Sequence, residues 1–302
     1  MTRMNELTLA QELRYTFPNL TVREREPMSA HSSFRIGGPA DIFVEPAFEM
    51  ELAALQRFLR EKGIVPAVIG RGTNLLVHDE GVRGVVIHLG DAFAGIRAED
   101  DVLYAEAGVS LAKLAVTAKE LGLAGLEFAH GIPGSLGGAV MMNAGAYGGE
   151  MKDVVASVRY MNAFGSTAET EEPGFAYRKS MFTGGHDLIL GAAIRLQPDD
   201  PAAIQARMQE LREKRSASQP LELPSAGSTF KRPRTGYAAA LIEQAGLKGL
   251  TIGGAQVSEK HAGFVVNVGG ATFADVSALM QRITETVYEK FSVRLEPEVQ
   301  IL

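Results

Sequence analysis

A glycine-rich segment without charged residues, residues 131–149, constrains the fold of this chain more than any other feature. It reads GIPGSLGGAVMMNAGAYGG, with seven glycines in nineteen residues, and no Asp, Glu, Lys or Arg occurs between Phe128 and Gly149. Glycine allows sharp turns and close approach to a ligand, and backbone amides bind phosphate without a basic side chain. We expect a loop and short helix that lie against a ligand, with close packing as the alternative.

Composition limits the partners and the chemistry. A spanning helix needs about twenty predominantly apolar residues with few breakers, whereas the 131–149 segment mixes Pro133 with glycines, so we expect no membrane partner. The chain has 302 residues and a net charge of −6, which predicts a globular protein of two or three domains and disfavours nucleic acid. No signal peptide is evident at the start, and a cytoplasmic location is the default expectation.

Cysteine and histidine usage narrows the choice of cofactor. Zero cysteines exclude disulfides, thiol catalysis and iron–sulfur clusters. The six histidines are scattered without metal-ligand spacing, so we expect no metal site. His130 adjoins the glycine-rich segment, and we interpret it as a surface or hydrogen-bonded imidazole. Redox chemistry would therefore need an organic cofactor or a metal held without sulfur.

Hydrophobic periodicity predicts a compact α+β protein. Helices are expected over about 5–17, around Leu52 to Leu59, after the Ser110 cap, around Ile204 to Leu211, over about 237–245, and after the Thr272–Asp275 capping pattern. Strands are expected over 22–26, 41–45, 65–69, 85–89, 102–106, 154–161, 188–196, 264–266 and 298–301. Residues 197–201 are expected to form a linker, and residues 219–234 a loop.

A second glycine turn, residues 70–74, follows a predicted strand, and its amides could surround an anion. Leu75 stands where a dinucleotide fingerprint has its third glycine, and the next residues read as a strand, so the turn is not that fingerprint. Taken by itself, such a glycine turn more often has a structural role than an anion-binding one.

Three polar residues in predicted loops are ambiguous by themselves. Arg178 lies among aromatic residues, where a salt-bridged arginine is the usual finding. Ser228 follows a glycine, where a turn or cap serine is usual. Glu298 follows Pro297, where a solvated carboxylate is usual.

Six segments in order resemble the UDP-N-acetylenolpyruvoylglucosamine reductase family of bacterial flavoenzymes over nearly the whole chain. They are FRIGGPAD (34–41), GRGTNLLV (70–77), GIPGSLGGA (131–139) with NAGAY (143–147), YRKS (177–180), AGSTFK (226–231) and LEPEV (295–299). Arg232 stands where longer relatives have Asn, so the chain resembles the shorter subclass, which lacks a substrate-clamping tyrosine loop.

The resemblance implies a two-lobed FAD-binding domain of the vanillyl-alcohol-oxidase (PCMH) type and a C-terminal α+β substrate-binding domain. The first lobe would comprise residues 1–90 with the C-terminal strand 297–302, the second lobe 91–197, and the domain for the UDP-sugar 198–296. The implied cofactors are non-covalent FAD and NADPH as hydride donor. The resemblance does not fix the oligomeric state, and a monomer is favoured.

The resemblance also gives individual residues roles. Arg178 and Glu298 would polarise the substrate carboxylate, with Glu296 the weaker candidate, and Ser228 would deliver a proton. Tyr177, Arg178 and Lys231 would bind the UDP-sugar. Residues that would contact FAD are Gly70, Arg71, Gly72, Thr73, Asn74, Leu75, Gly131, Ile132, Pro133, Gly134, Ser135, Gly137, Gly138, Asn143, Ala144 and Gly145.

Two alternatives stay open at this point. One is a different flavoenzyme on the same scaffold, such as an oxidase with covalent FAD, although that would leave Arg178, Ser228 and Glu298 without a shared purpose. The other is a nucleotide-binding module without catalysis, which would give a protein without a flavin absorption spectrum.

Overall fold

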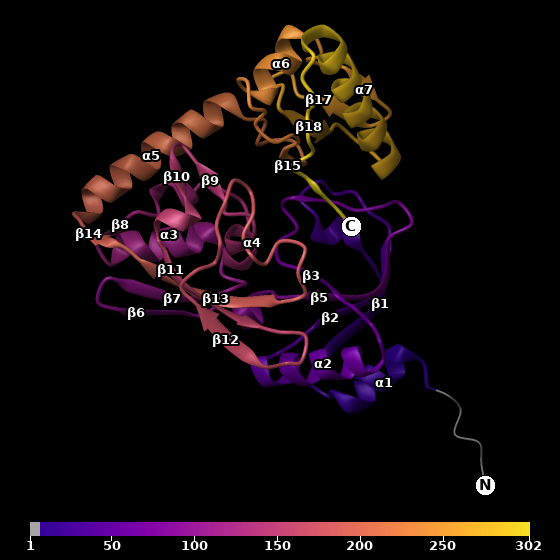
Figure 1. Ribbon diagram of the computed structural model, residues 1–302, viewed down its shortest axis with the longest axis vertical. Coiled ribbons are helices and arrows are strands. Elements are labelled where there is room, and N and C mark those ends of the chain that lie inside the picture. Colours follow the sequence, from indigo (N-terminus) through magenta and orange to yellow (C-terminus); the bar gives the residue numbers. More distant parts are fainter. Residues whose placement is uncertain (1–6) are drawn as a thin grey trace. The chain divides into compact units, whose positions relative to one another are not determined.

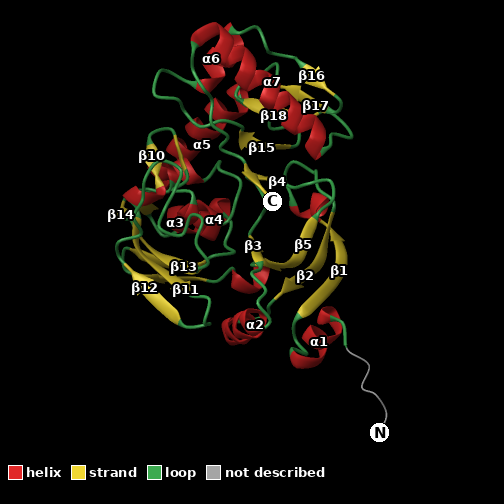
Figure 2. Ribbon diagram, turned by 45° about the vertical axis from the view of Figure 1, so that its right-hand side comes forward, coloured by secondary structure: helices red, strands yellow, loops and turns green. Residues whose placement is uncertain are grey.

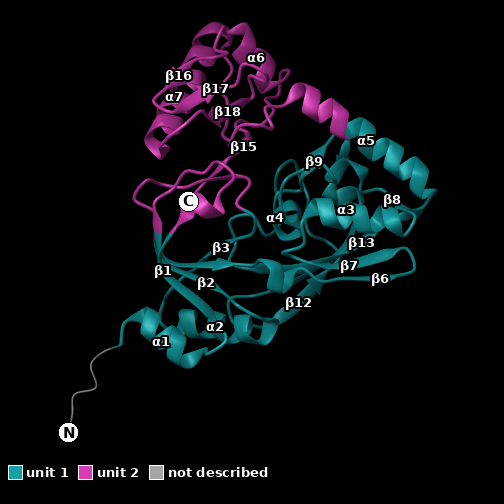
Figure 3. Cartoon of the chain, turned by 180° about the vertical axis from the view of Figure 1, so that it is seen from behind, with its two compact units in different colours: residues 1–26, 40–71, 83–211 teal, residues 27–39, 72–82, 212–302 magenta. Residues whose placement is uncertain are grey.

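The computed structural model describes residues 7–302, so residues 5 and 6 of the first expected helix lie outside the described part. The chain forms two compact units (Figure 3). Unit 1 comprises residues 1–26, 40–71 and 83–211, and unit 2 comprises residues 27–39, 72–82 and 212–302. The division into two FAD-binding lobes and a substrate domain stays a prediction.

Unit 1 contains a four-stranded sheet in the order β1-β2-β5-β3, in which β3 and β5 run parallel. Its elements are α1 (Leu9–Thr16), β1 (Thr21–Pro27), β2 (Pro39–Glu45), α2 (Glu49–Glu61), β3 (Ala67–Ile69) and β5 (Val82–His88). A capping box between Thr8 and Gln11 starts α1. The predicted stripe of Leu52, Leu55 and Leu59 is fully buried, which confirms the helix expected there.

A five-stranded antiparallel sheet, in the order β12-β11-β13-β7-β6, completes the core of unit 1. Its elements are β6 (Ile96–Glu99), β7 (Val102–Glu106), α3 (Leu111–Glu120), α4 (Leu136–Met141), β11 (Val155–Met161), β12 (Thr167–Thr170) and β13 (Leu188–Arg195). Helix α4 packs against β13 and β7, and Figure 2 shows α3 and α4 on the same side of this sheet. The short α4 carries the middle of the glycine-rich segment.

Short elements connect these layers. They are η2 (Asp91–Phe93), β8 (Leu123–Ala124), η3 (Glu127–Ala129), β9 (Gly145–Ala146), β10 (Gly149–Glu150), η4 (Met151–Asp153), β14 (Gln197–Pro198) and α5 (Pro201–Ser218). The predicted linker 197–201 begins with β14, which pairs with β8. Asp200 lies just before α5, and its carboxylate accepts a hydrogen bond from Ala202 N at 3.2 Å. The boundary between the two units falls within α5 (Figure 3).

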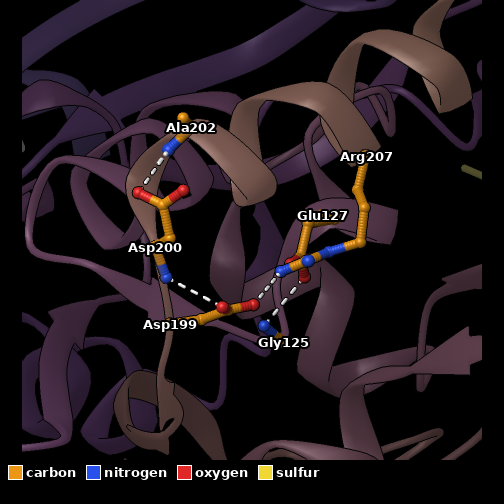
Figure 4. Close-up of polar contacts among 6 residues, drawn as sticks. All are labelled: Gly125, Glu127, Asp199, Asp200, Ala202 and Arg207. Carbon is orange, nitrogen blue, oxygen red and sulfur yellow. Dashed lines mark hydrogen bonds and ion pairs between the residues drawn. The ribbon is translucent and has the colours of Figure 1, made fainter.

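Arg207 of α5 bonds two acidic residues of unit 1 (Figure 4). Its Nε and Nη2 donate to Glu127 Oε1 at 2.9 and 2.7 Å, and Nη2 also donates to Asp199 Oδ2 at 2.6 Å. Glu127 Oε2 in turn accepts a hydrogen bond from Gly125 N at 2.8 Å. These bonds attach the first half of α5 to the segment that enters the glycine-rich loop.

Unit 2 is built on a four-stranded sheet in the order β15-β18-β17-β16. Helix α7 packs against β17 (Figure 1) and also against β16. Its elements are η1 (Met28–His31), β4 (Leu75–Leu76), β15 (Ser225–Ser228), α6 (Ala238–Gln244), β16 (Thr251–Ile252), β17 (Ala255–Val257), β18 (Phe264–Asn267), α7 (Phe273–Phe291) and β19 (Gln300–Ile301). The expected Thr272–Asp275 capping box starts α7. Part of the expected 219–234 loop is strand β15.

The C-terminal strand β19 pairs in parallel with β4, with Gln300 opposite Leu75. Gln300 N donates to Asn74 O at 2.8 Å, and Leu302 N donates to Leu76 O at 3.0 Å. Residues distant in sequence are thereby joined in unit 2. Among the described helices, none combines the length and apolar character needed to cross a membrane.

Candidate active site

The glycine-rich segment lies in unit 1, where it begins after η3 and runs through α4 and β9 to the first residue of β10. It is anchored where Gly137 N donates to Ala107 O at 2.8 Å. Among the described residues, the amides of Gly134, Ser135 and Gly138 donate to no backbone carbonyl outside helix α4, and Ser135 makes no side-chain cap bond. An uncharged backbone with such amides fits the pyrophosphate of a dinucleotide cofactor such as FAD.

The two glycine loops come together within unit 1. A Cβ on Gly70 would collide with Ser135 Oγ, so the backbone of the first loop passes directly against the side chain of the second. A Cβ on Gly138 would have only Ser135 Oγ within 4 Å, at 3.9 Å, so Gly138 faces open space. The residues present therefore fit a ligand that approaches the backbone closely.

Arg178 lies in a tight turn that is also part of unit 1. Ala176 N donates to Lys179 O (2.9 Å) and Lys179 N to Ala176 O (3.2 Å), and Arg178 takes the left-handed conformation at φ 55°. Its guanidinium lies 5.1 Å from the Tyr177 ring centroid, and Nη2 approaches Gly145 O at 3.5 Å. The predicted catalytic arginine is thus close to the glycine-rich segment.

Glu150, which the sequence analysis did not single out, ends the uncharged segment beside this turn. Hydrogen bonding to Lys152, whose Nζ is 2.9 Å away, is the main cause that lowers the pKa of Glu150, and the charge of Arg178 acts in the same direction. The signal that could have found it is its place as the first charge after the uncharged run.

Ser228 and Glu298 are brought together in unit 2. Glu298 N donates to Thr229 O at 2.9 Å, and Phe230 forms an antiparallel bridge with Pro297. Ser228 is exposed at the end of β15, whereas its neighbour Thr229 is buried. The backbone therefore places the predicted proton donor next to the strand that carries the predicted carboxylate.

Two further predicted residues join this part of unit 2. Lys231 N donates to Glu296 O at 2.8 Å, and Lys231 Nζ lies 3.7 Å from Glu296 Oε2. Asn74 Nδ2 donates to Glu298 O at 3.2 Å. Glu296 is exposed and paired with a lysine, while Glu298 is half-buried, and the choice of Glu298 as the catalytic carboxylate stays a prediction.

The second glycine turn is packed rather than flexible. Gly72 has φ +61°, and a Cβ there would collide with His31 O. Ser33 N also donates to Gly72 O at 3.2 Å. Only glycine fits at this position.

The predicted site residues divide between the units. Those in unit 1 are Gly70, Arg71, Gly131, Ile132, Pro133, Gly134, Ser135, Gly137, Gly138, Asn143, Ala144, Gly145, Tyr177 and Arg178. Those in unit 2 are Gly72, Thr73, Asn74, Leu75, Ser228, Lys231 and Glu298. Within residues 7–302, no group of three His, Cys, Asp or Glu side chains could hold a metal ion.

This architecture is that of an α+β protein with an FAD-binding domain, as expected. Residues 40–171 match the family described as "FAD binding domain". Residues 219–302 match "UDP-N-acetylenolpyruvoylglucosamine reductase, C-terminal domain".

Similarity to individual proteins extends over most of the chain. The UDP-N-acetylenolpyruvoylglucosamine reductase of Syntrophomonas wolfei is 45% identical over 94% of this chain and 96% of the relative. That of Heliobacterium modesticaldum is 49% identical over 92% and 90%. The crystal structure of the reductase from Thermus caldophilus superimposes with a TM-score of 0.81 at 35% identity, over 93% of this chain and 99% of that chain. The chain belongs to the UDP-N-acetylenolpyruvoylglucosamine reductase family.

Proposed function

We propose that this protein uses NADPH and FAD to reduce the enolpyruvyl ether of UDP-N-acetylglucosamine to UDP-N-acetylmuramate, a step of peptidoglycan precursor synthesis. One observation carries the assignment of the site. The Glu298 amide bonds Thr229 O at 2.9 Å, so two segments distant in sequence, each with one predicted catalytic residue, are adjacent in unit 2. Family membership supplies the reaction.

The chain's own residues would supply binding and charge. When bound, FAD would supply the redox chemistry, by accepting a hydride from NADPH and passing it to the vinyl carbon of the substrate. The amides of Gly134, Ser135 and Gly138 would hold its pyrophosphate. No basic side chain within the 131–149 segment is needed for this contact.

Arg178 and Glu298 would act on the substrate carboxylate. Negative charge that develops next to that carboxylate during reduction is stabilised by fixed positive or hydrogen-bonding groups. The Arg178 guanidinium supplies the positive charge from a closed turn, which limits the reorganisation needed at the moment of reaction. We assign Glu298 to the same polarisation and Tyr177 to contact with the UDP-sugar.

Ser228 would deliver the proton to the carbon next to the carboxylate. A serine hydroxyl is a weak acid, and it transfers a proton only to a strongly basic carbon that is already in position. The buried bonds of Thr229, whose Oγ1 accepts from Val265 N at 2.9 Å, fix the backbone at the adjacent residue. Lys231 would bind the diphosphate of the UDP-sugar.

We also propose that FAD is bound without a covalent link, that the protein is a cytoplasmic monomer, and that residues 198–296 form the substrate domain. Zero cysteines rule out a cysteinyl link to the flavin. Denaturation in acid followed by filtration separates free from attached flavin, and a yellow protein pellet would contradict non-covalent binding.

The reaction is tested in two anaerobic steps. The purified protein should show a flavin absorption spectrum, and NADPH should bleach it. Addition of the enolpyruvyl UDP-sugar should then restore the oxidised spectrum with formation of UDP-N-acetylmuramate. A flavin that stays reduced in the presence of this substrate would overturn the proposed function.

A further inference from the structure

Asn143 is buried at the end of α4, where all of its side-chain hydrogen-bonding groups meet protein atoms. The residue is 1% exposed. Its Nδ2 donates to Glu150 Oε2 at 2.8 Å and to Ala176 O at 3.2 Å, while its Oδ1 accepts from Lys152 N at 2.9 Å. Both protons of the amide are therefore used within the protein.

The backbone of Asn143 explains why an asparagine stands there. Its φ is 40°, a left-handed conformation that asparagine adopts more readily than most residues. Asn143 N donates to Val140 O at 3.2 Å, and Ala144 N donates to Ala139 O at 2.8 Å, so Asn143 terminates α4. Glycine would also adopt this backbone conformation, but it has no side chain to make the three hydrogen bonds.

Ala176 O, the acceptor of Asn143 Nδ2, is the atom that also closes the Arg178 turn by accepting from Lys179 N. The other side of the turn is attached to the same helix end. Ser180 Oγ and Thr183 Oγ1 donate to Met141 O at 2.9 and 3.0 Å. The turn is thus fixed at both of its ends to the C-terminus of α4.

The Nδ2 bond to Glu150 affects the charge near Arg178. It holds the carboxylate of Glu150, whose pKa is lowered first by its hydrogen bond to Lys152, with Asn143 and the charge of Arg178 adding to the effect. An ionised carboxylate is therefore kept near the guanidinium of Arg178. Asn143 thereby connects the turn and its charged neighbour through a single amide group.

We propose that Asn143 is a positioning residue for Arg178 and so for recognition of the substrate carboxylate, rather than a direct ligand of FAD through its side chain. The proposal rests on the proposed function, which gives Arg178 its role. Displacement of a binding group by about 1 Å can cost about 10²-fold in rate. Loss of the Asn143 amide should therefore slow the step in which Arg178 acts.

The test uses Asn143→Gly, which keeps the left-handed backbone and removes only the side chain. The matched control is Asn162→Gly, because Asn162 Oδ1 also accepts backbone bonds, from Phe164 N (2.9 Å) and Ser166 N (3.1 Å), in a turn that contains none of the assigned site residues. In Asn143→Gly, flavin reduction by NADPH should stay within about threefold of wild type, while reoxidation at saturating UDP-sugar falls about 10–10²-fold. Asn162→Gly should leave both steps unchanged.

A readout without turnover comes from the apoprotein. Asn143→Gly should speed hydrogen exchange in a peptide covering residues 174–182, and Asn162→Gly should not. If exchange there is unchanged, the tie between Asn143 and the turn is refuted. This measurement tests whether Asn143 holds the turn even if the wild-type protein fails to reduce the UDP-sugar. Such a failure would refute the proposed function and not the role of Asn143 in the turn.

A double-mutant cycle separates positioning from a structural role. Combined with Arg178→Ala, Asn143→Gly should add little further loss of reoxidation rate if it acts through Arg178. Additive losses, or equal slowing of both half-reactions, would overturn the proposal. Should Asn143→Gly not fold, Asn143→Ala removes the same donor without placing a second carboxylate against Glu150, and the same selective loss is expected.

Discussion

Replacing Arg207 with methionine should destabilise unit 1 by about 2 kcal/mol, a value that follows from the burial of its partner. Arg207 donates twice to Glu127 Oε1, at 2.9 and 2.7 Å. The Glu127 side chain is only 12% exposed, while that of Arg207 is 42% exposed. Methionine keeps the unbranched apolar stem and removes the charge and the donors.

The magnitude is bounded from both sides. A hydrogen bond to a charged group contributes about 1.5–3 kcal/mol, and its loss leaves a largely buried carboxylate without its charged partner. Solvent around the exposed guanidinium screens part of the attraction between Arg207 and Glu127, since fully exposed pairs contribute only about 0.2–1 kcal/mol. A loss of about 2 kcal/mol lowers the melting temperature by about 4–8 °C, at about 2–4 °C per kcal/mol for a large domain.

The assay is thermal unfolding followed by circular dichroism, with Arg14→Met as the control. Arg14 pairs with Glu24 at 2.8 Å, but the two side chains are 46% and 50% exposed. The control should lower the melting temperature by no more than about 4 °C, and by less than Arg207→Met. Equal shifts for the two variants would refute the argument from the burial of Glu127.

The pH dependence of Arg207→Met provides a second check. Hydrogen bonding by Arg207 is the main cause that lowers the pKa of Asp199 from its usual 3.8. A carboxylate whose pKa is lowered in the folded state stabilises it above the unfolded pKa, and this contribution is lost as pH falls through the folded pKa. The difference between wild type and Arg207→Met should therefore be constant near neutral pH and shrink below about pH 4.

Three other perturbations test the site and the fold. Ser228→Ala should leave flavin reduction by NADPH intact and lower UDP-sugar turnover by about 10²–10⁴-fold; parallel loss of both half-reactions would instead mean a structural role. Gly72→Ala should lower the melting temperature more than Gly236→Ala, because both have positive φ but only Gly72 would collide, with His31 O; similar shifts would contradict this. Thr272→Ala removes the hydroxyl that accepts a hydrogen bond from the N3 amide of α7 at 3.1 Å. It should lower the free energy of unfolding, measured in urea, by about 1 kcal/mol, and an unchanged free energy would contradict the role of Thr272 as a cap.

The helices were predictable where apolar spacing and caps agree. Leu52, Leu55 and Leu59 mark α2, and the Ser110 and Thr272 hydroxyls accept the cap bonds expected of them. Two of the polar strands were not predicted, although the polar strand expected over 22–26 is present as β1. Residues 167–170 form β12 through pairing with β11, and Ser225–Ser228 forms β15 through pairing with β18. Such pairings depend on neighbours distant in sequence, which local patterns do not contain.

The catalytic assignments came from the family resemblance and not from local patterns. Nothing around Glu298 in sequence indicates that its amide bonds Thr229. The glycine-rich segment was identifiable from its composition alone. Its backbone amides lie in the segment for which the sequence predicted a phosphate ligand. The role proposed for Asn143 required the fold, because its partners at Ala176, Glu150 and Lys152 are set by a left-handed turn that composition does not encode.

The pairing of β19 with β4 bears on the order in which this protein folds. During translation, the edge of β4 is made long before Gln300 and Leu302, whose backbone groups bond it. Unit 2 is assembled from residues 27–39, 72–82 and 212–302, so its early segments must wait for its last one. Unit 1 is complete in sequence by residue 211, so we expect it to begin folding during synthesis, whereas the pairing of β4 with β19 has to wait for the last residues. Contacts over such long sequence separations are slow to form, and this late strand is where we expect folding of the whole chain to be rate-limited.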